Sequence, residues 1–319
     1  MALRPFERLP YDALPALPRI PHGYHRAEAR TVRVPSRIFG DVRVHVRVTG
    51  SGPPLLLVHG LMTSSYSFRY VLEPLGRHFR VYAPDMPGSG RSDKPTGADF
   101  SARSFGAFLA ELQEALGIRG CVIAGNSLGG YVAMHLALQD PAAASRLVVN
   151  HAPGTPDPRY FALRALLSTG AGRALLRHLV QRDPRRWVYR NVHYHDERLK
   201  SREELDEYGA PLATDDGITC FTKSLHETLA PAGFRAFVDA LGRAPFPVPL
   251  LFVYARKDPV VPPRVGEALH RLARGSELRY LDGTSHFSHV DSPDRLVDTI
   301  LPFLRAGEPG EAARAPLGG

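Results

Sequence analysis

A serine flanked by glycines is the residue in this chain best suited to covalent chemistry. Ser127 stands at the centre of residues 125–129 (Gly-Asn-Ser-Leu-Gly), after an apolar segment at 121–124 and before a helical pattern at 130–138. So tight a turn between strand and helix holds a serine in strained backbone angles and leaves room only for small neighbours. Its hydroxyl would lie at the start of a helix, where backbone amides and the helix dipole favour developing negative charge. The context therefore predicts a nucleophile.

A serine hydroxyl needs a base to take its proton and an acid to orient that base. Asp258 follows the apolar segment 250–255, and His286 follows the segment 277–281. Functional side chains gather at the carboxyl ends of parallel strands, so both positions are suitable. The chain order Ser127, Asp258, His286 is one of the three orders common among such triads. A Ser-Asp-His triad is therefore predicted.

Other residues compete for these roles. His289 lies three residues beyond His286 and is a second candidate base, while Asp282 and Asp291 are further acids nearby. The chain has 14 histidines, so one histidine alone carries little information. Asp258 alone would more often cap a turn.

Short apolar segments at helix-length intervals indicate the elements that would position these residues. They lie at residues 55–58, 80–83, 121–124, 146–149, 250–254 and 277–281. Strands that are apolar on both faces belong to a mostly parallel sheet with helices on both sides. Residues 31–34 and 42–48 alternate and predict an N-terminal antiparallel hairpin. The expected fold class is α/β.

The alternation breaks between residues 154 and 244, which hold helical patterns and no convincing strand. We expect a helical cap there, inserted into a core domain made of residues 29–153 and 245–305. Residues 1–28, interrupted by prolines, predict an extended arm, and residues 306–319 a disordered tail. Six cap side chains are candidates to line a substrate pocket, although packing onto the core is the better expectation for any one of them. They are Phe161, Leu163, Leu166, Trp187, Tyr189 and Phe221.

Composition excludes several classes of protein. With 44% hydrophobic residues among 319, the chain can bury a sizeable core. The net charge is +8, and residues 159–205 alone hold 11 Lys/Arg against 5 Asp/Glu. That segment is helical and carries no nucleic-acid motif, so we expect a solvated arginine-rich face and no nucleic-acid partner. The alternative is that this segment attracts an anionic substrate or an acidic membrane surface. Two cysteines make no disulfide framework, and no run approaches a membrane span of about 18 apolar residues. A cytoplasmic protein without an integral membrane segment is expected.

Five motifs resemble the α/β-hydrolase superfamily in order and spacing, over roughly residues 31–305. They lie at residues 59–65, 83–93, 125–130, 258–262 and 286–293. In that family the catalytic histidine opens a His-x-x-x-x-acid-x-Pro run, which implies His286 rather than His289 and gives Asp291 a structural role. The side chains of His59 and Asp85 are likewise implied to brace loops.

The same resemblance implies an oxyanion hole. One backbone amide is expected from Leu128, directly after the nucleophile, and the other from Leu61, after His59-Gly60. Loss of one such donor typically lowers turnover by about 10²- to 10³-fold.

The front motifs, residues 64–66 and 90–95, resemble the haloalkane dehalogenase and epoxide hydrolase branch of the superfamily. Those enzymes use an aspartate at the nucleophile position to form an alkyl ester. Serine stands there in this chain, and its alkyl ether could not be hydrolysed, so both chemistries are disfavoured. Some dehalogenases keep an acid after the strand that ends near Val149, but Asn150 and His151 stand at that place. This again favours Asp258.

The segment around Ser127 also resembles esterases and the carbon–carbon bond hydrolases that act on ring-cleavage products. We predict a serine hydrolase that cleaves a small or medium hydrophobic carboxylic ester through an acyl-enzyme, with no cofactor and no metal. The alternatives are carbon–carbon bond hydrolysis, a cofactor-free haloperoxidase or perhydrolase activity, and a slow-turnover ligand-binding protein on the same fold. Leu61-Met62-Thr63 and Phe287 differ from the glycine-rich stretch and tryptophan usual in carbon–carbon hydrolases.

Overall fold

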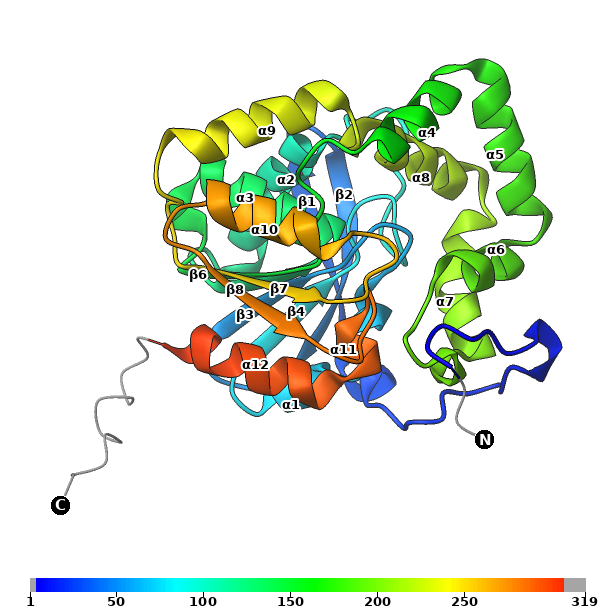
Figure 1. The fold of residues 1–319 in the computed structure, drawn as a ribbon, viewed down its shortest axis with the longest axis horizontal. Helices are drawn as coiled ribbons and strands as arrows, with labels where there is room; N and C mark the ends of the chain where they lie inside the picture. Colours follow the sequence, from blue (N-terminus) through cyan, green and yellow to red (C-terminus); the bar gives the residue numbers. More distant parts are fainter. Residues whose placement is uncertain (1–3, 307–319) are drawn as a thin grey trace.

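The computed structural model, which describes residues 4–306, is built around one eight-stranded sheet (Figure 1). The strand order is β1-β2-β4-β3-β5-β6-β7-β8. The strands are β1 (Glu28–Ser36), β2 (Gly40–Thr49), β3 (Pro54–Val58), β4 (Arg80–Pro84), β5 (Val122–Asn126), β6 (Arg146–Asn150), β7 (Leu250–Ala255) and β8 (Glu277–Leu281). The first two pair antiparallel and β2 joins β4 antiparallel, while the other neighbours are parallel. The predicted α/β class, with its N-terminal hairpin, is confirmed.

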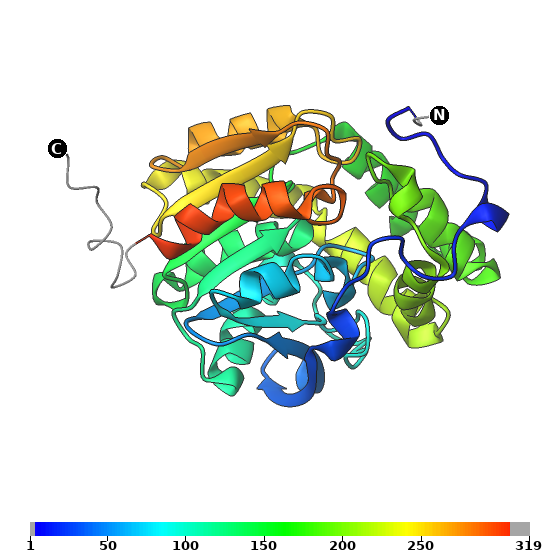
Figure 2. The ribbon, with the colours of Figure 1, turned by 90° about the horizontal axis from the view of Figure 1, so that it is seen from below.

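Helices cover both faces of the sheet. They are α1 (Leu72–Gly76), α2 (Ala102–Leu116), α3 (Leu128–Gln139), α4 (Pro158–Ser168), α5 (Gly170–Arg182), α6 (Pro184–Asn191), α7 (Arg202–Leu212), α8 (Asp215–Thr228), α9 (Pro231–Arg243), α10 (Pro263–Leu272), α11 (Ser288–Asp291) and α12 (Pro293–Arg305). The helices α1 and α12 cover one face (Figure 2), and α2, α3 and α10 the other. Because the central strands are covered on both sides, every residue of β7 is buried.

Six helices, α4 to α9, connect β6 to β7, and α4 to α8 project beyond the sheet at one end (Figure 1). The last helix, α9, differs from the expectation of a cap that runs to residue 244. It lies along the core, where Phe234 stacks on Tyr131 of α3 and Phe237 meets the same ring edge-on. Its apolar face is therefore covered by α3, so this helix belongs to the outer layer of the core.

The N-terminal arm, described from residue 4, runs along the cap before β1 begins (Figure 1). It contains two 3-10 turns, Tyr11–Ala13 and Tyr24–Arg26. The backbone amides of Arg202 and Glu203, at the start of α7, donate to the carbonyls of Pro15 and Ala16. The arm therefore ties the cap to the hairpin. Of the predicted tail, 306–319, all but Ala306 lies outside the described residues.

A buried ion pair joins the cap to the core. Arg69 lies in the segment before α1, and its Nη2 is 3.3 Å from Oε2 of Glu204 in α7. Both side chains are fully buried. The hydroxyl of Tyr194 also donates to Glu204. Removing one partner of such a pair leaves an uncompensated buried charge, so these groups hold the cap in one position.

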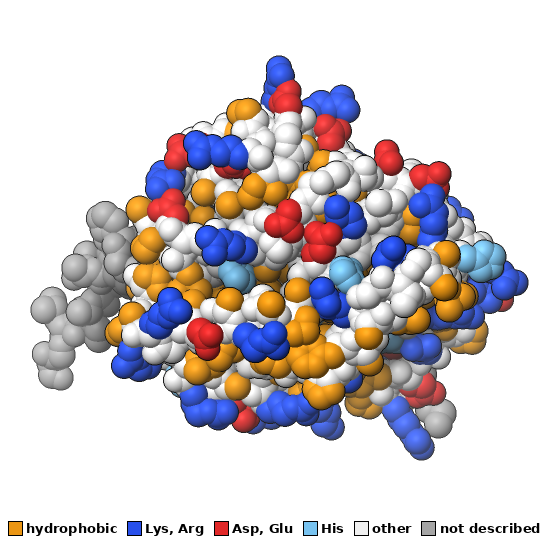
Figure 3. All heavy atoms as spheres, turned by 90° about the horizontal axis from the view of Figure 1, so that it is seen from above, with side chains coloured by type: hydrophobic (Ala, Val, Ile, Leu, Met, Phe, Trp, Pro, Cys, Tyr) orange, Lys and Arg blue, Asp and Glu red, His pale blue; other side chains and the backbone are white. Residues whose placement is uncertain are grey.

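The surface carries mixed charge. The upper face of the molecule shows Lys and Arg side chains interspersed with Asp and Glu (Figure 3). Several arginines of the basic segment are paired, among them Arg159 with Asp157 and Arg185 with Asp206. Across residues 4–306, no helix has both the length and the apolar character that crossing a membrane requires.

Candidate active site

The turn between β5 and α3 places Ser127 at the amino end of a helix. Its backbone has φ +55°, a conformation that few non-glycine residues adopt. A Cβ on Gly125 would lie 2.5 Å from the amide nitrogen of Gly130, and one on Gly129 would lie 2.1 Å from the carbonyl oxygen of Val58. Both positions therefore require glycine, as the sequence predicts, and the packing forces the serine into its strained angles.

The loops after β7 and β8 bring Asp258 and His286 together. His286 Nδ1 lies 2.7 Å from Asp258 Oδ2, a charge-assisted hydrogen-bond distance, and both side chains are buried. The other carboxylate oxygen, Oδ1, accepts from the amides of Val260 and Val261, at 2.7 and 2.9 Å. Asp258 thus caps a turn with one oxygen and orients an imidazole with the other. The turn fixes the carboxylate plane.

A second imidazole, that of His151, to which sequence reasoning assigned no role, lies against the same carboxylate. His151 Nδ1 is 3.3 Å from Asp258 Oδ2, and both side chains are fully buried. His151 Nε2 lies 3.1 Å from the hydroxyl of Ser288, at the start of α11. Because β6 neighbours β7 in the sheet, a polar residue after β6 necessarily lies near Asp258. That adjacency is the signal that could have found it.

Burial raises the pKa of Asp258, but the charge of His286 and hydrogen bonds from His151 and His286 outweigh it. The pKa of Asp258 therefore lies below its ordinary value, and the group is a carboxylate at neutral pH. Burial lowers the pKa of His151, so this ring is neutral under the same conditions. His286 accordingly has an anionic partner and a neutral neighbour.

The competing candidates lie elsewhere. His289 is buried beside Phe68 and Phe287, and neither ring nitrogen has a hydrogen-bond partner among the described residues. Asp282 is largely exposed and pairs with Arg256 at 3.3 Å. Neither is placed to serve Ser127.

Ser127 and His286 open on one cavity of about 220 Å³ between the core and the cap. Leu61 and Leu128 line it beside the serine, so the two amides predicted for the oxyanion hole belong to residues at its wall. Of the described residues that line this cavity, none is Lys, Arg, Asp or Glu. The cavity can therefore receive an apolar, uncharged group next to the serine.

Residues 53–293 match the model of the family described as alpha/beta hydrolase fold. The chain belongs to this family. The uncharacterized protein Rv2715 of Mycobacterium tuberculosis is 31% identical over 311 residues, which cover 94% of this chain and 84% of the relative. The 2-hydroxy-6-oxo-2,4-heptadienoate hydrolase of Pseudomonas putida is 26% identical, over 84% of this chain and 94% of that enzyme.

Among solved structures, epoxide hydrolase CorEH superposes with a TM-score of 0.74 at 23% identity, covering 86% of this chain and 98% of that one. This likeness concerns the fold. The chain is thus an alpha/beta hydrolase, and Ser127 lies at its turn between β5 and α3.

Two side chains of this alpha/beta hydrolase brace the loops around the cavity. His59 Nε2 accepts from the amide of Met86 at 2.9 Å. Asp85 accepts from the amides of Ser65 and Arg91, each at 2.8 Å. These contacts hold the loop after β3 and the loop after β4 together.

Of the six candidate pocket residues of the cap, two line the catalytic cavity and four, Phe161, Leu166, Trp187 and Tyr189, do not. Leu163 and Phe221 line the catalytic cavity. Leu166 is 49% exposed. Tyr189 donates its hydroxyl to the carbonyl of Leu9, so it faces the N-terminal arm.

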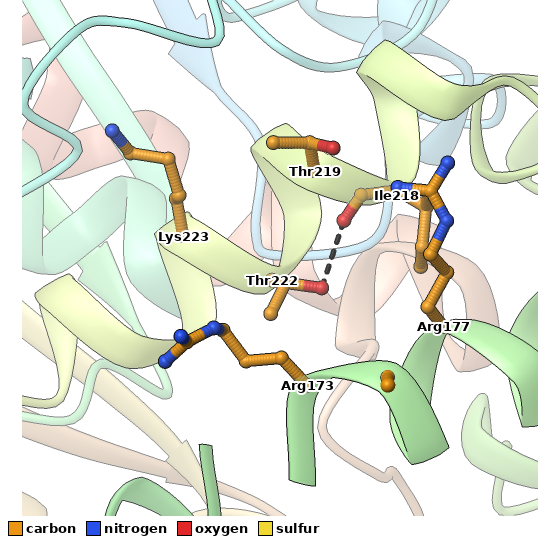
Figure 4. A pocket seen from close by; sticks show the side chains of 7 residues that line it. Arg173, Arg177, Ile218, Thr219, Thr222 and Lys223 are labelled. Atoms are coloured by element: carbon orange, nitrogen blue, oxygen red, sulfur yellow. Dashed lines mark hydrogen bonds between the residues drawn. The ribbon is translucent and has the colours of Figure 1, made fainter. Parts of the chain in front are cut away.

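A second hollow, of about 300 Å³, lies on the cap between α5 and α8 (Figure 4). Arg173 and Arg177 of α5 and Lys223 of α8 line it. It contains none of the predicted site residues, and Arg177 is paired with Asp215. This hollow is separate from the catalytic cavity.

Three potential metal ligands, His151 Nδ1, Asp258 Oδ2 and His286 Nδ1, lie within 4.8 Å of one another. Two ligands of a tetrahedral zinc ion stand about 3.3 Å apart, given bonds of about 2.0–2.1 Å. The 2.7 Å between His286 and Asp258 is instead a hydrogen-bond distance. The group fits a hydrogen-bonded triad better than a metal centre.

Asp291 connects the loop that holds His286 to the cap. It is expected to make the free energy of unfolding depend on pH. It accepts from the amide of Ser285, next to His286, at 2.6 Å, and from that of His195 in the cap at 2.7 Å. Burial raises the pKa of Asp291 to about 7. Because this folded-state pKa exceeds the ordinary value of 3.8, the protonated form is favoured on folding, and its stabilisation is lost as pH rises from about 4 to 7.

Urea unfolding of wild type and Asp291→Asn between pH 4 and 8 measures this effect. The free energy of unfolding of wild type, relative to the variant, should fall by about 1.4 kcal/mol per pH unit within that window. A difference that does not change with pH would mean that the carboxylate stays ionised throughout.

Proposed function

We propose that this hydrolase cleaves small or medium uncharged esters of carboxylic acids. The observation that carries the proposal is the cavity into which both Ser127 and His286 open. Most of its lining is apolar, and none of the described residues that line it is Lys, Arg, Asp or Glu. An acyl chain of moderate length would occupy the space beside Leu163 and Phe221.

In the proposed reaction, Ser127 Oγ attacks the ester carbonyl while His286 Nε2 takes its proton. Asp258 holds His286 through Nδ1 and stabilises the imidazolium that forms. The amides of Leu61 and Leu128 receive the oxyanion, and His286 returns the proton to the leaving alkoxide. Water, activated by the same histidine, then hydrolyses the acyl-enzyme. The chain's own residues supply each of these steps.

Carbon–carbon bond hydrolysis is the second candidate, because the Pseudomonas putida relative is named for a heptadienoate substrate. The name denotes a carboxylate. An anionic group taken out of water is best stabilised by a cation, and the described lining of this cavity includes no lysine or arginine. Besides Ser127 and His286, its polar side chains are the uncharged ones of Tyr131, Tyr160, Asn191 and Thr228. The cavity therefore favours the neutral ester.

Two esters that differ only in charge test the proposal. The p-nitrophenyl ester of valeric acid and the mono-p-nitrophenyl ester of glutaric acid have acyl chains of the same carbon number, but the second ends in a carboxylate. We expect kcat/KM for the neutral ester to be at least roughly 100-fold higher, because the carboxylate would be buried unpaired.

Equal rates for the two esters, or a preference for the glutaric ester, would contradict the proposal. A single burst of p-nitrophenol without further turnover would instead indicate the slow ligand-binding protein. Cleavage of a vinylogous diketone acid without cleavage of either ester would indicate the carbon–carbon hydrolase.

A further inference from the structure

His151 is a fully buried imidazole that the proposed reaction does not use. Its backbone has φ +50°, in the left-handed region that non-glycine residues seldom adopt, although His, Asn and Asp do so more often than the others. Its amide donates to the carbonyl of Val253 in β7 at 3.0 Å, which fixes the strained turn against the neighbouring strand. The fold therefore holds this ring rigidly in one place.

The ring has two possible neutral tautomers, and its neighbours distinguish them. Nδ1 lies 3.3 Å from Asp258 Oδ2, and the amide of Ala255, also 3.3 Å away, directs its N–H toward the same nitrogen. If Nδ1 accepted from Ala255, its lone pair would face the buried carboxylate. If Nδ1 carries the proton, it donates to that carboxylate, and Nε2 accepts from the hydroxyl of Ser288 at 3.1 Å. The second tautomer takes the Nδ1 acceptor away from the amide of Ala255. It also replaces a lone pair that faces a buried carboxylate by a hydrogen bond to an ionised acceptor, which is roughly twice as strong as a neutral one, so the second tautomer is favoured.

We propose that His151 is a positioning residue of the triad, whose Nδ1–H, donated to Asp258 Oδ2, holds the carboxylate in line with His286. Oδ2 then accepts one hydrogen bond from His286 and a second from His151 in the loop after β6. The amides of Val260 and Val261 donate to Oδ1. The carboxylate has no freedom to turn from His286. This inference rests on the proposed function for its reaction, but its geometry concerns the triad alone.

The donor also tunes the base. A hydrogen bond to Asp258 stabilises its negative charge and weakens its pull on a protonated His286. Loss of that donor should therefore strengthen the attraction between Asp258 and a protonated His286 and move the acidic limb of the activity profile upward. Other titratable or charged groups near the pair are the same in wild type and in the His151 variants; they are Arg159, Tyr160, Tyr254 and His289.

The test compares His151→Phe with His151→Asn. Phenylalanine keeps a ring but has no donor. Asparagine places an amide N–H at the position of the imidazole Nδ1, and it tolerates a positive φ better than most residues. The measurement is the second-order rate of Ser127 labelling by a fluorophosphonate from pH 5 to 9, with thermal melting of each variant. Labelling requires the triad but not a particular ester.

We expect His151→Phe to lower the labelling rate at the wild-type optimum by roughly ten- to hundredfold, the range for loss of a hydrogen bond to a charged group. Its acidic limb should move up by about half to one pH unit. His151→Asn should restore most of the rate and the wild-type limb. With esters, kcat should fall while KM changes little, because His151 is not among the residues that line the cavity.

The control is His289→Phe. His289 is equally buried and lies three residues beyond His286, but its ring has no hydrogen-bond partner among the described residues. Its replacement should leave the pH profile unchanged. If His151→Phe does not fold, His151→Leu, which also lacks a donor, takes its place.

An unshifted profile in the variant without the donor, or the same shift in His289→Phe, would overturn the proposal. So would a His151→Asn variant as slow as His151→Phe. A wild-type protein that labels at Ser127 but hydrolyses neither ester would refute the proposed function and still leave the role of His151 open to this measurement.

Discussion

Replacement of Ser127 by alanine is expected to lower kcat for a neutral ester by roughly 10⁴- to 10⁶-fold and to leave the fold intact. The hydroxyl is the only atom removed, so the covalent route is lost, while the cavity and the amides of Leu61 and Leu128 remain. Alanine keeps the Cβ that the serine already carries at φ +55°, so the turn stays equally strained. Steady-state kinetics with p-nitrophenyl valerate, together with thermal melting, measure both effects.

Ser67→Ala is the matched control for that substitution. Ser67 is also buried, its hydroxyl has no hydrogen-bond partner among the described residues, and it does not line the cavity. Its loss should change kcat less than about twofold, as for substitutions away from a functional group. Activity of Ser127→Ala above about 1% of wild type would contradict nucleophilic catalysis by this serine.

The parts of the fold that follow from local physics could be read from the sequence. Strands buried on both faces appear as short apolar runs, which is why β5, β6 and β7 were predicted near their observed positions. The turn at Ser127 is equally local, because Gly125 and Gly129 are required by backbone contacts of less than 3 Å. The adjacency of Asp258 and His286 followed from the rule that parallel strands end at one edge of a sheet.

The remainder depends on tertiary packing, which a single sequence does not encode locally. A helical pattern shows that α9 exists, but not that Phe234 and Phe237 pack on the core instead of roofing the cavity. Buried charges such as Arg69 and Glu204 resemble surface residues until the partner is known. His151 is one of 14 histidines, and only the sheet order places it against Asp258.

Replacement of Asp258 by asparagine is expected to lower kcat by roughly 10⁴-fold, the effect typical of amide substitution at a triad acid. The turn dictates how the amide must sit. The amides of Val260 and Val261 donate to Oδ1, so the asparagine oxygen must occupy that position and its NH₂ group must take the place of Oδ2. That NH₂ group then faces Nδ1 of His286, which must give up its proton there in order to accept a hydrogen bond.

The imidazole is thereby held with its proton on Nε2, where it cannot take one from Ser127. The rate of fluorophosphonate labelling should fall with kcat, because both need the same base. Asp282→Asn is the control, since Asp282 is 71% exposed and its partner is Arg256; its kcat should match wild type. A loss of less than tenfold in Asp258→Asn would mean that Asp258 only caps its turn. In that case, since Asp282 points away and Asp291 is engaged by Ser285 and His195, His286 would have to act without an orienting acid.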